Sequence, residues 1–146
     1  MKYINRLTLA LLIIIGLQLT ACAPKETKVE KIQPFQLEEI DGSDLKRVIL
    51  TAKAAERLDI QTSQVQDEQI SGVSRKVVSY AAILYDLEGQ TWLYTNPAPL
   101  TFVRESITVD FIDGDTAVLV KGPSSGTEVV VIGVAELYGT ETGVSK

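Results

Sequence analysis

The stretch that decides the fold is Phe102-Val103-Arg104-Glu105-Ser106-Ile107-Thr108-Val109-Asp110-Phe111. Within it, apolar residues occupy one parity and polar residues the other: Val103, Ile107, Val109 and Phe111 against Arg104, Ser106, Thr108 and Asp110. Because successive side chains of a strand point to opposite faces of a sheet, the alternation predicts a half-buried strand. We expect the apolar set to face a core and the polar set to face solvent.

Further β-rich runs cover residues 60–65, 77–85, 91–95, 116–120 and 128–134. Turn signals separate several of them, namely Asp86-Leu87-Glu88-Gly89, Asp113-Gly114-Asp115 and Gly122-Pro123-Ser124-Ser125-Gly126. Short turns of this kind join antiparallel neighbours. The sequence therefore predicts a mainly β fold, either a small antiparallel barrel or a sandwich.

One short helix is predicted before these strands. Thr51 is a suitable N-cap for the helix formers that follow it, and Ala55 and Leu58 are spaced to face a core. The helix has about two turns, so it depends on tertiary packing.

The segment 22–46 is polar and charged and shows no sustained periodicity, which predicts a flexible spacer. About 25 flexible residues would give a reach of roughly 25–30 Å. The alternative is that Phe35 to Ile40 dock as an edge strand on the folded domain. The expected organisation is a cleaved segment 1–21, a spacer 22–46 and a β-domain 47–146.

The first 21 residues have the pattern of a secretory signal peptide. Lys2 and Arg6 precede an apolar run over residues 7–17, which is too short to span a bilayer. Leu19-Thr20-Ala21-Cys22 looks like a bacterial lipobox, in which the cysteine is lipidated and becomes the mature N-terminus. An ordinary signal peptide with an accidental cysteine and an uncleaved anchor are the alternatives. We expect export and lipid anchoring at Cys22.

Charge and cysteine content exclude several classes of protein. Without Lys2 and Arg6 the mature chain would carry 12 basic and 19 acidic side chains, a formal charge of −7. Such a surface repels phosphate backbones, so no nucleic-acid partner is expected. Cys22 is the only cysteine, so an internal disulfide is impossible.

Enzymatic chemistry is not expected. The chain has no histidine, which excludes Ser-His-Asp and Cys-His arrangements. Asp110, Asp113 and Asp115 lie close in sequence but lack the spacing of a calcium loop, so a solvated hairpin tip is the simpler interpretation. We predict no catalytic, metal or cofactor residues.

Candidate partner contacts are the aromatic and proline-rich positions. The strand aromatics either fill the core or, at Trp92, contribute to an exposed patch. The loops supply the other candidates, which are Asn96, Pro97, Pro99, Pro123 and Ser124.

Five segments after Val48 share a pattern with a known family. They are Leu50-Thr51-Ala52-Lys53-Ala54-Ala55-Glu56-Arg57-Leu58-Asp59-Ile60-Gln61-Thr62, Val78-Ser79-Tyr80-Ala81-Ala82-Ile83-Leu84-Tyr85-Asp86, Trp92-Leu93-Tyr94, the run from Gly122 to Gly133, and Ala135-Glu136-Leu137-Tyr138-Gly139. In this order and spacing, the chain from Val48 onward resembles the membrane-proximal region of periplasmic adaptor subunits of resistance-nodulation-division (RND) efflux pumps, also called membrane fusion proteins of the haemolysin D type.

This chain departs from the family pattern in two ways. Asp59 and Ser79 replace the usual glycine and proline, and nothing resembles the lipoyl-like domain or the long helical hairpin of a full adaptor. The resemblance implies a truncated adaptor.

Two function classes follow. One is a non-enzymatic adaptor or accessory subunit, partnered by a transporter permease or other adaptor proteins and tethered to a membrane by its N-terminal lipid. The other is a free-standing lipoprotein binding module for a small molecule or envelope component. Export to the extracytoplasmic or periplasmic face is expected, with inner and outer membrane both open.

Overall fold

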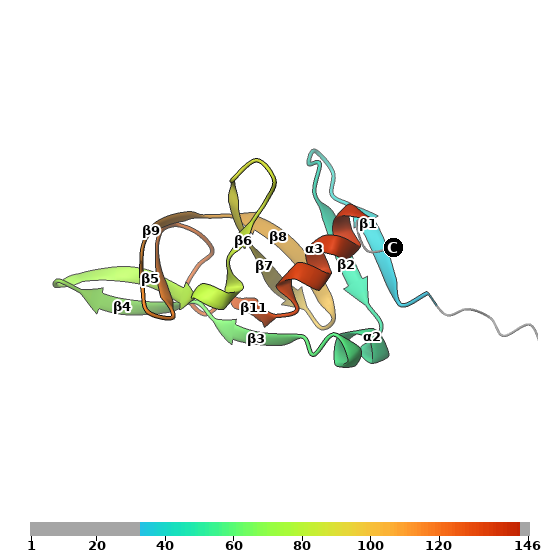
Figure 1. The fold of residues 1–146 in the computed structure, drawn as a ribbon, viewed down its shortest axis with the longest axis horizontal. Helices are drawn as coiled ribbons and strands as arrows, with labels where there is room; N and C mark the ends of the chain where they lie inside the picture. The colour runs from blue at the N-terminus through green and yellow to red at the C-terminus, as the bar shows by residue number, and fades with distance from the viewer. Residues whose placement is uncertain (1–32, 144–146) are drawn as a thin grey trace, which may run out of the picture. The chain divides into compact units, whose positions relative to one another are not determined.

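The computed structural model describes residues 33–143, which form two antiparallel sheets with short helices (Figure 1). The strands are β1 (Phe35–Glu39), β2 (Lys46–Leu50), β3 (Gln61–Gln64), β4 (Gln66–Ile70), β5 (Val73–Ser79), β6 (Leu84–Tyr85), β7 (Thr91–Ala98), β8 (Thr101–Ser106), β9 (Thr108–Asp113), β10 (Thr116–Lys121) and β11 (Glu128–Ile132). The helices are α2 (Ala52–Arg57), α3 (Val134–Thr142) and the single 3-10 turn η1 (Tyr80–Ala82).

The larger sheet has the strand order β1-β2-β8-β7-β11-β3, with β6 also paired to β7, and the smaller has the order β4-β5-β10-β9. Every strand pair is antiparallel. The predicted mainly β, antiparallel fold is confirmed. The sheets do not close into a barrel, which agrees with the sandwich alternative.

Two long strands bend from one sheet into the other. β3 continues into β4 through Val65, and β8 continues into β9 through Ile107. Both side chains are buried, and both backbone amides stay paired: Val65 N–H donates to the Thr127 carbonyl and Ile107 N–H to the Thr91 carbonyl. These bends make the corners of the sandwich.

The bend corrects the prediction of one continuous strand over residues 102–111. Ile107 is buried as expected, but Phe111 is 42% exposed, and the buried residue of β8 is Phe102. The strand changes sheets at Ile107, and irregular pairing of β9 with β10 shifts its register near Val109. The alternation of core-facing and solvent-facing residues in β8 therefore does not continue in step through β9.

The folded domain includes residues assigned above to the spacer. β1 pairs along its length with β2, with Phe35 opposite Leu50, and Thr51 N–H donates to the Pro34 carbonyl. Phe35 also packs against the buried cluster beneath it. This is the edge-strand alternative kept open for Phe35 to Ile40, and it moves the start of the folded domain ahead of residue 47. Residues 1–32, including Cys22, lie outside the described part of the chain.

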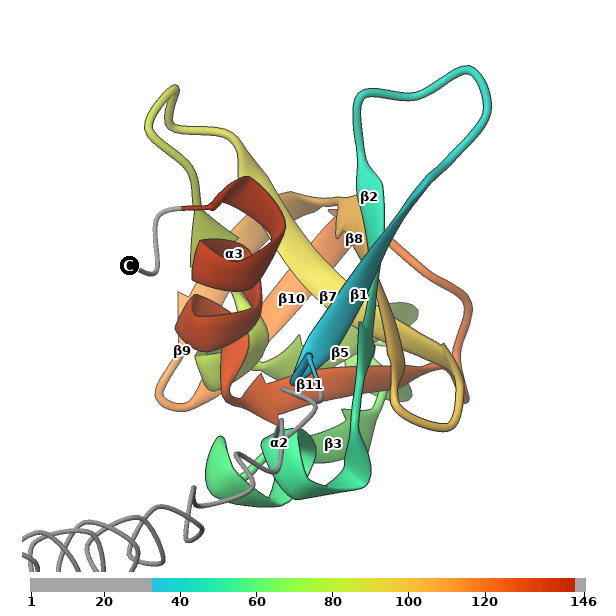
Figure 2. The same ribbon diagram turned by 90° about the vertical axis from the view of Figure 1, so that its right-hand side faces the viewer.

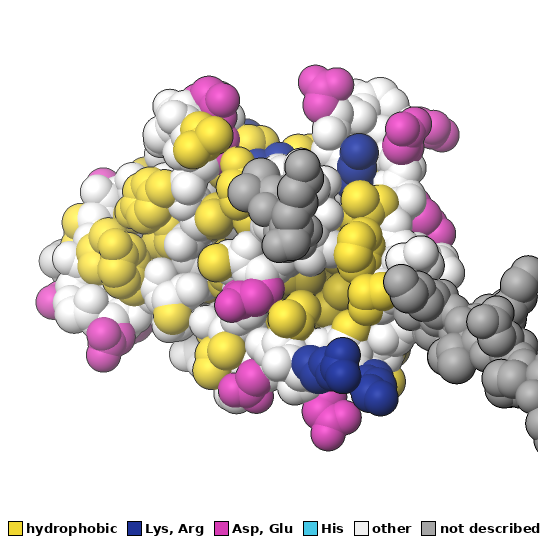
Figure 3. All heavy atoms as spheres, turned by 45° about the vertical axis from the view of Figure 1, so that its right-hand side comes forward, with side chains coloured by type: hydrophobic (Ala, Val, Ile, Leu, Met, Phe, Trp, Pro, Cys, Tyr) yellow, Lys and Arg dark blue, Asp and Glu magenta, His cyan; other side chains and the backbone are white. Residues whose placement is uncertain are grey.

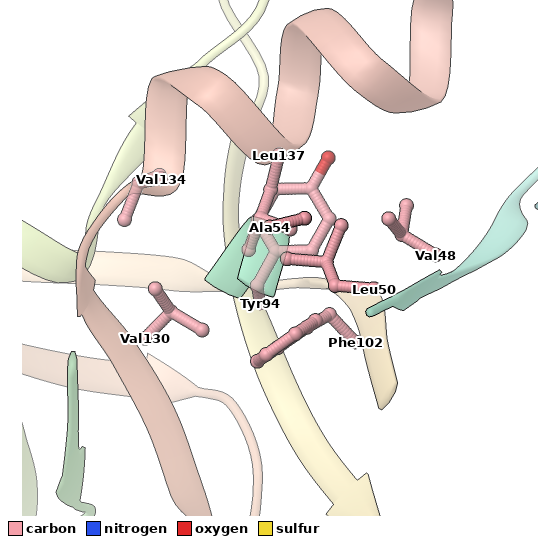
Figure 4. Close-up of a cluster of buried hydrophobic side chains, with 8 residues drawn as sticks. All are labelled: Val48, Leu50, Ala54, Tyr94, Phe102, Val130, Val134 and Leu137. Atoms are coloured by element: carbon pink, nitrogen blue, oxygen red, sulfur yellow. The ribbon is translucent and has the colours of Figure 1, made fainter. Parts of the chain in front are cut away.

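Two buried clusters form the core. The first lies between the larger sheet and the helices and contains Val48, Leu50, Ala54, Tyr94, Phe102, Val130, Val134 and Leu137 (Figure 4). The second combines residues of both sheets with the two bend residues and contains Val65, Val78, Ala82, Leu93, Ile107, Ala117, Leu119 and Val129.

Helix α2 forms where it was predicted. The Thr51 hydroxyl accepts a hydrogen bond from Ala54 N–H, which caps the first turn, and Ala55 and Leu58 pack against the first cluster. Helix α3 was not predicted: strand β11 ends at Ile132, Gly133 adopts a left-handed conformation at φ 90°, and a helix starts at Val134. Figure 2 shows α3 lying against the larger sheet beside β2 and β7.

Two of the three predicted turns connect paired strands. Asp86 to Gly89 joins β6 to β7, and Asp113 to Asp115 joins β9 to β10. The third, Gly122 to Gly126, follows β10 of the smaller sheet and leads to β11 of the larger sheet, so it crosses between sheets rather than closing a hairpin.

Candidate docking site at one end of the domain

Two of the predicted contact loops leave the larger sheet at the same end. Thr95 of β7 lies opposite Val129 of β11 in an antiparallel pair. Residues that follow Thr95 and residues that precede Val129 therefore emerge together. These are the loop around Asn96, Pro97 and Pro99 and the loop that contains Pro123 and Ser124.

The first of these loops has a defined shape. Asn96 Nδ2 donates to the carbonyls of Ala98 at 2.7 Å and Thr101 at 2.8 Å, and Leu100 has a positive φ of 58°. Pro97, Ala98 and Pro99 are exposed, while Asn96 is partly buried. The fixed amide and the two prolines present a preorganised tip, which lowers the entropy lost on docking.

The second loop is anchored at one end and open at the other. Pro123 is buried, and Lys76 Nζ donates to the Gly122 carbonyl at 2.9 Å. Ser124 to Gly126 are exposed, with Thr127 N–H donating to the Ser124 carbonyl at 3.1 Å. Ser124 is thus available to a partner, whereas Pro123 supports the loop from beneath.

Trp92 does not belong to this end. It lies near the start of β7, and Pro97 near its finish. The Trp92 ring is partly buried and stacks on the Arg104 guanidinium, whose Cζ is 4.5 Å from the ring centroid. Its Nε1 donates to Asp86 Oδ2 at 2.8 Å. Trp92 therefore packs internally and separately from the two loops.

A buried polar cluster joins α3 to the larger sheet. The Tyr94 hydroxyl donates to Glu141 Oε2 at 2.5 Å, and Figure 4 shows this hydroxyl pointing toward α3. The Arg104 guanidinium contacts the same carboxylate, with Nε 3.3 Å from Oε2 and Nη2 3.4 Å from Oε1. Lys46 N–H adds a long hydrogen bond of 3.4 Å to Oε1. The Arg104 and Glu141 side chains are 12% and 3% exposed.

This cluster corrects the expectation that Arg104 faces solvent. Its Nε is buried and makes no well-aligned hydrogen bond despite lying 3.3 Å from Glu141 Oε2, so the Nη2 hydrogen bond, charge attraction and aromatic stacking hold the guanidinium in place. The second aromatic ring is that of Tyr138, 5.3 Å from Cζ. Burial, and then the bond to Glu141, raise the pKa of Tyr94 far above its usual range.

The rest of the described surface is strongly acidic. Residues 33–143 contain 8 Lys and Arg against 17 Asp and Glu. Asp113 and Asp115 are exposed near the β9–β10 tip, and Asp110 pairs with Arg75 at 2.5 Å. Among the residues that the structure describes, no three His, Cys, Asp or Glu side chains are grouped to hold a metal ion.

No helix within residues 33–143 is long and apolar enough to cross a bilayer. Comparison with known proteins finds no matching family model, no matching curated protein and no matching solved structure.

Proposed function

We propose that this chain is a non-enzymatic, membrane-tethered lipoprotein that acts as a truncated adaptor or accessory subunit of an RND-type efflux transporter. Support comes from the signal and lipobox pattern ending at Cys22, the absence of histidine, and the resemblance of the residues after Val48 to adaptor membrane-proximal regions. A compact β-domain after a short tether suits a protein that works at a membrane surface.

The observation that carries the proposal is the pairing of Thr95 with Val129. It brings two exposed loops, widely separated in sequence, to one end of the domain, where they can form one contact surface. The Asn96 hydrogen bonds hold one of these loops in a fixed shape before any partner arrives.

Lipid anchoring would make a modest contact sufficient. A tether confines the domain and a membrane-embedded transporter to one surface, and this raises their effective concentration. Two or more acyl chains hold a protein stably on a membrane, whereas one does not. Replacing Cys22→Ser should therefore release the protein from the membrane fraction and also weaken any docking.

The docking surface is tested by photocrosslinking in membranes from positions 98 and 124. Ala135 is the matched control for Ala98, since both are exposed alanines and Ala135 follows the opposite end of β11. We expect a transporter permease to be captured from 98 and 124 and not from 135. If neither loop captures a transporter and the purified domain binds a small ligand specifically, the free-standing binding module replaces this proposal.

A further inference from the structure

The tip of the β6–β7 hairpin presents an unusual residue for a turn. Leu87 is 94% exposed, the most exposed of the large hydrophobic side chains in residues 33–143. Turns of this kind favour Gly, Pro, Asn, Asp and Ser. Single exposed leucines are common on protein surfaces, but the residues around Leu87 favour a role in binding.

The tip is held rigidly by Asp86. Oδ1 of its carboxylate accepts hydrogen bonds from Glu88 N–H at 3.0 Å and Gln90 N–H at 2.7 Å. The backbone closes the turn, with Gly89 N–H donating to the Asp86 carbonyl and Asp86 N–H to the Gln90 carbonyl. Leu87 is therefore displayed on a loop whose shape is already fixed.

The same aspartate ties the tip to the buried interior. Oδ2 of Asp86 accepts the Trp92 Nε1 hydrogen bond, and Trp92 stacks on Arg104. Arg104 in turn contacts Glu141 of α3. Because these contacts anchor the tip to the core, the tip would lose little conformational entropy when Leu87 inserts into a partner.

Exposed aromatic surface adjoins the tip. Tyr85 is 50% exposed and Tyr80 is 44% exposed. Burial, and then the neighbouring Tyr80, raise the pKa of Tyr85. In the space-filling view, the projecting tip shows hydrophobic surface beside acidic side chains (Figure 3).

The charge around Leu87 is negative. Glu88 follows it and is exposed. Burial alone would raise the pKa of Asp86, but the bonds from Trp92, Gln90 and Glu88 outweigh it and lower that pKa, so Asp86 is a carboxylate at neutral pH. With 17 acidic against 8 basic side chains in residues 33–143, the whole domain repels anionic headgroups.

We infer that the β6–β7 tip is a second docking site, at which Leu87 enters an apolar pocket of a partner protein that is bordered by Lys or Arg side chains. This site is distinct from the loops at Asn96 and Ser124, because Thr91 and Ala98 are the two ends of β7. The domain therefore offers contact surfaces at both ends, and the inference does not require the partner to be a transporter.

The test uses the full-length protein in membranes of the cells that make it. A photoreactive phenylalanine analogue is placed at position 87, at position 85, or at the control Val73, which is 58% exposed on the β4–β5 hairpin. We expect positions 87 and 85 to capture one and the same protein and position 73 to capture none of it. The adducted peptide of that protein should contain apolar residues beside Lys or Arg.

Two variants separate apolar insertion from charge attraction. With the probe at 85, Leu87→Ser should abolish capture, and Glu88→Lys should reduce it roughly tenfold through like-charge repulsion. The control Asp67→Lys, on the exposed edge strand β4, should leave it unchanged. The urea midpoint of each variant should match that of the parent, since these side chains are exposed.

Three outcomes overturn the inference. Leu87-dependent binding to phosphatidylcholine or phosphatidylglycerol vesicles would make the tip a membrane contact. An adduct between two copies of this chain would make it a self-association surface. Equal capture from positions 73 and 87 would show that the tip has no special partner.

Discussion

The Tyr94 hydroxyl and the Glu141 carboxylate meet in the interior at 2.5 Å, joining the central strand β7 to the last turn of α3. Glu141 lies at the C-terminal end of its helix, where the helix dipole disfavours a negative charge. The carboxylate is therefore stabilised by tertiary contacts rather than by its own helix.

Removing this hydroxyl should destabilise the domain. In Tyr94→Phe the ring is retained and Glu141 loses a donor while staying buried, so we expect a loss of about 1–3 kcal/mol in the free energy of unfolding. Urea denaturation provides the measurement. Tyr85→Phe, at a half-exposed position, is the matched control and should change little; equal effects at the two positions would contradict this account.

Removing the cation should have a larger effect. Arg104→Met leaves the buried Glu141 carboxylate without its cation. Breaking a buried ion pair in this way lowers the free energy of unfolding by about 3–5 kcal/mol. The comparison is Arg47→Met, which breaks the exposed pair with Glu38 and should cost less than about 1 kcal/mol. Adding Glu141→Leu to Arg104→Met should restore part of the loss. Similar unfolding midpoints for the two single variants would argue against a structural role for the buried pair.

Alkaline pH should weaken the fold through Tyr94. Its pKa is raised in the folded state, whereas in the unfolded chain a tyrosine ionises at about pH 10. The stabilisation is complete below that pH and is lost as pH rises above it, by at most about 1.4 kcal/mol per pH unit. Urea titrations between pH 8 and pH 11 should show a shallower decline for Tyr94→Phe than for the parent. An equal decline in the stability of both proteins would show that Tyr94 does not cause the loss of stability at alkaline pH.

A side chain at Gly133 should destabilise the junction of β11 and α3. A Cβ atom there would lie 2.2 Å from Ile60 Cδ1, and the backbone φ is 90°. Gly126 has a similar φ of 85° but no neighbour within 4 Å of its Cβ position. We expect Gly133→Ala to be less stable than Gly126→Ala by about 1–3 kcal/mol, the typical effect of overpacking. Thermal unfolding of the two variants side by side checks this difference.

Strand β1 should prove part of the domain. A chain that starts at residue 33 retains Phe35 against the core, whereas one that starts at residue 46 loses it together with the β1–β2 pairing. The shorter chain should be less stable by about 1–2 kcal/mol, because the partly buried Phe35 contributes less than a fully buried side chain while the β1–β2 pairing is lost as well. Amide hydrogen exchange in β2 should also accelerate. Unchanged hydrogen exchange in β2 would show that residues 33–45 behave as a spacer and not as part of the folded domain.

The parts of the fold that could be predicted are those set by local sequence. Runs rich in β-branched and aromatic residues identified most strands, Asp-Gly signals located the β9–β10 hairpin, and Thr51 marked the start of α2. Helix α3 was also detectable, because Val134, Leu137, Tyr138 and Glu141 follow the i, i+3, i+4, i+7 spacing of a buried helix face. The β-branched run that precedes Gly133 and the glutamate on the inner face concealed it.

What could not be predicted depends on long-range pairing. Arg104 has the pattern of an exposed strand residue until Glu141, 37 positions later, is placed against it. The meeting of the Asn96 and Ser124 loops likewise follows from the register of β7 with β11, for which neither loop carries a signal. Exposure of Leu87 was not predicted either, since a leucine in a turn gives no sign of whether it packs inward.

The strands that bend at Val65 and Ile107 have a mechanical consequence. Because β3–β4 and β8–β9 each run through both sheets, a pull on one sheet reaches the other along covalent backbone and not only through side-chain contacts. The sheets cannot slide apart without breaking hydrogen bonds at the two bends, such as those donated by the Val65 and Ile107 amides. A domain built in this way should bear load as one stiff body and, when it fails, fail in a single step.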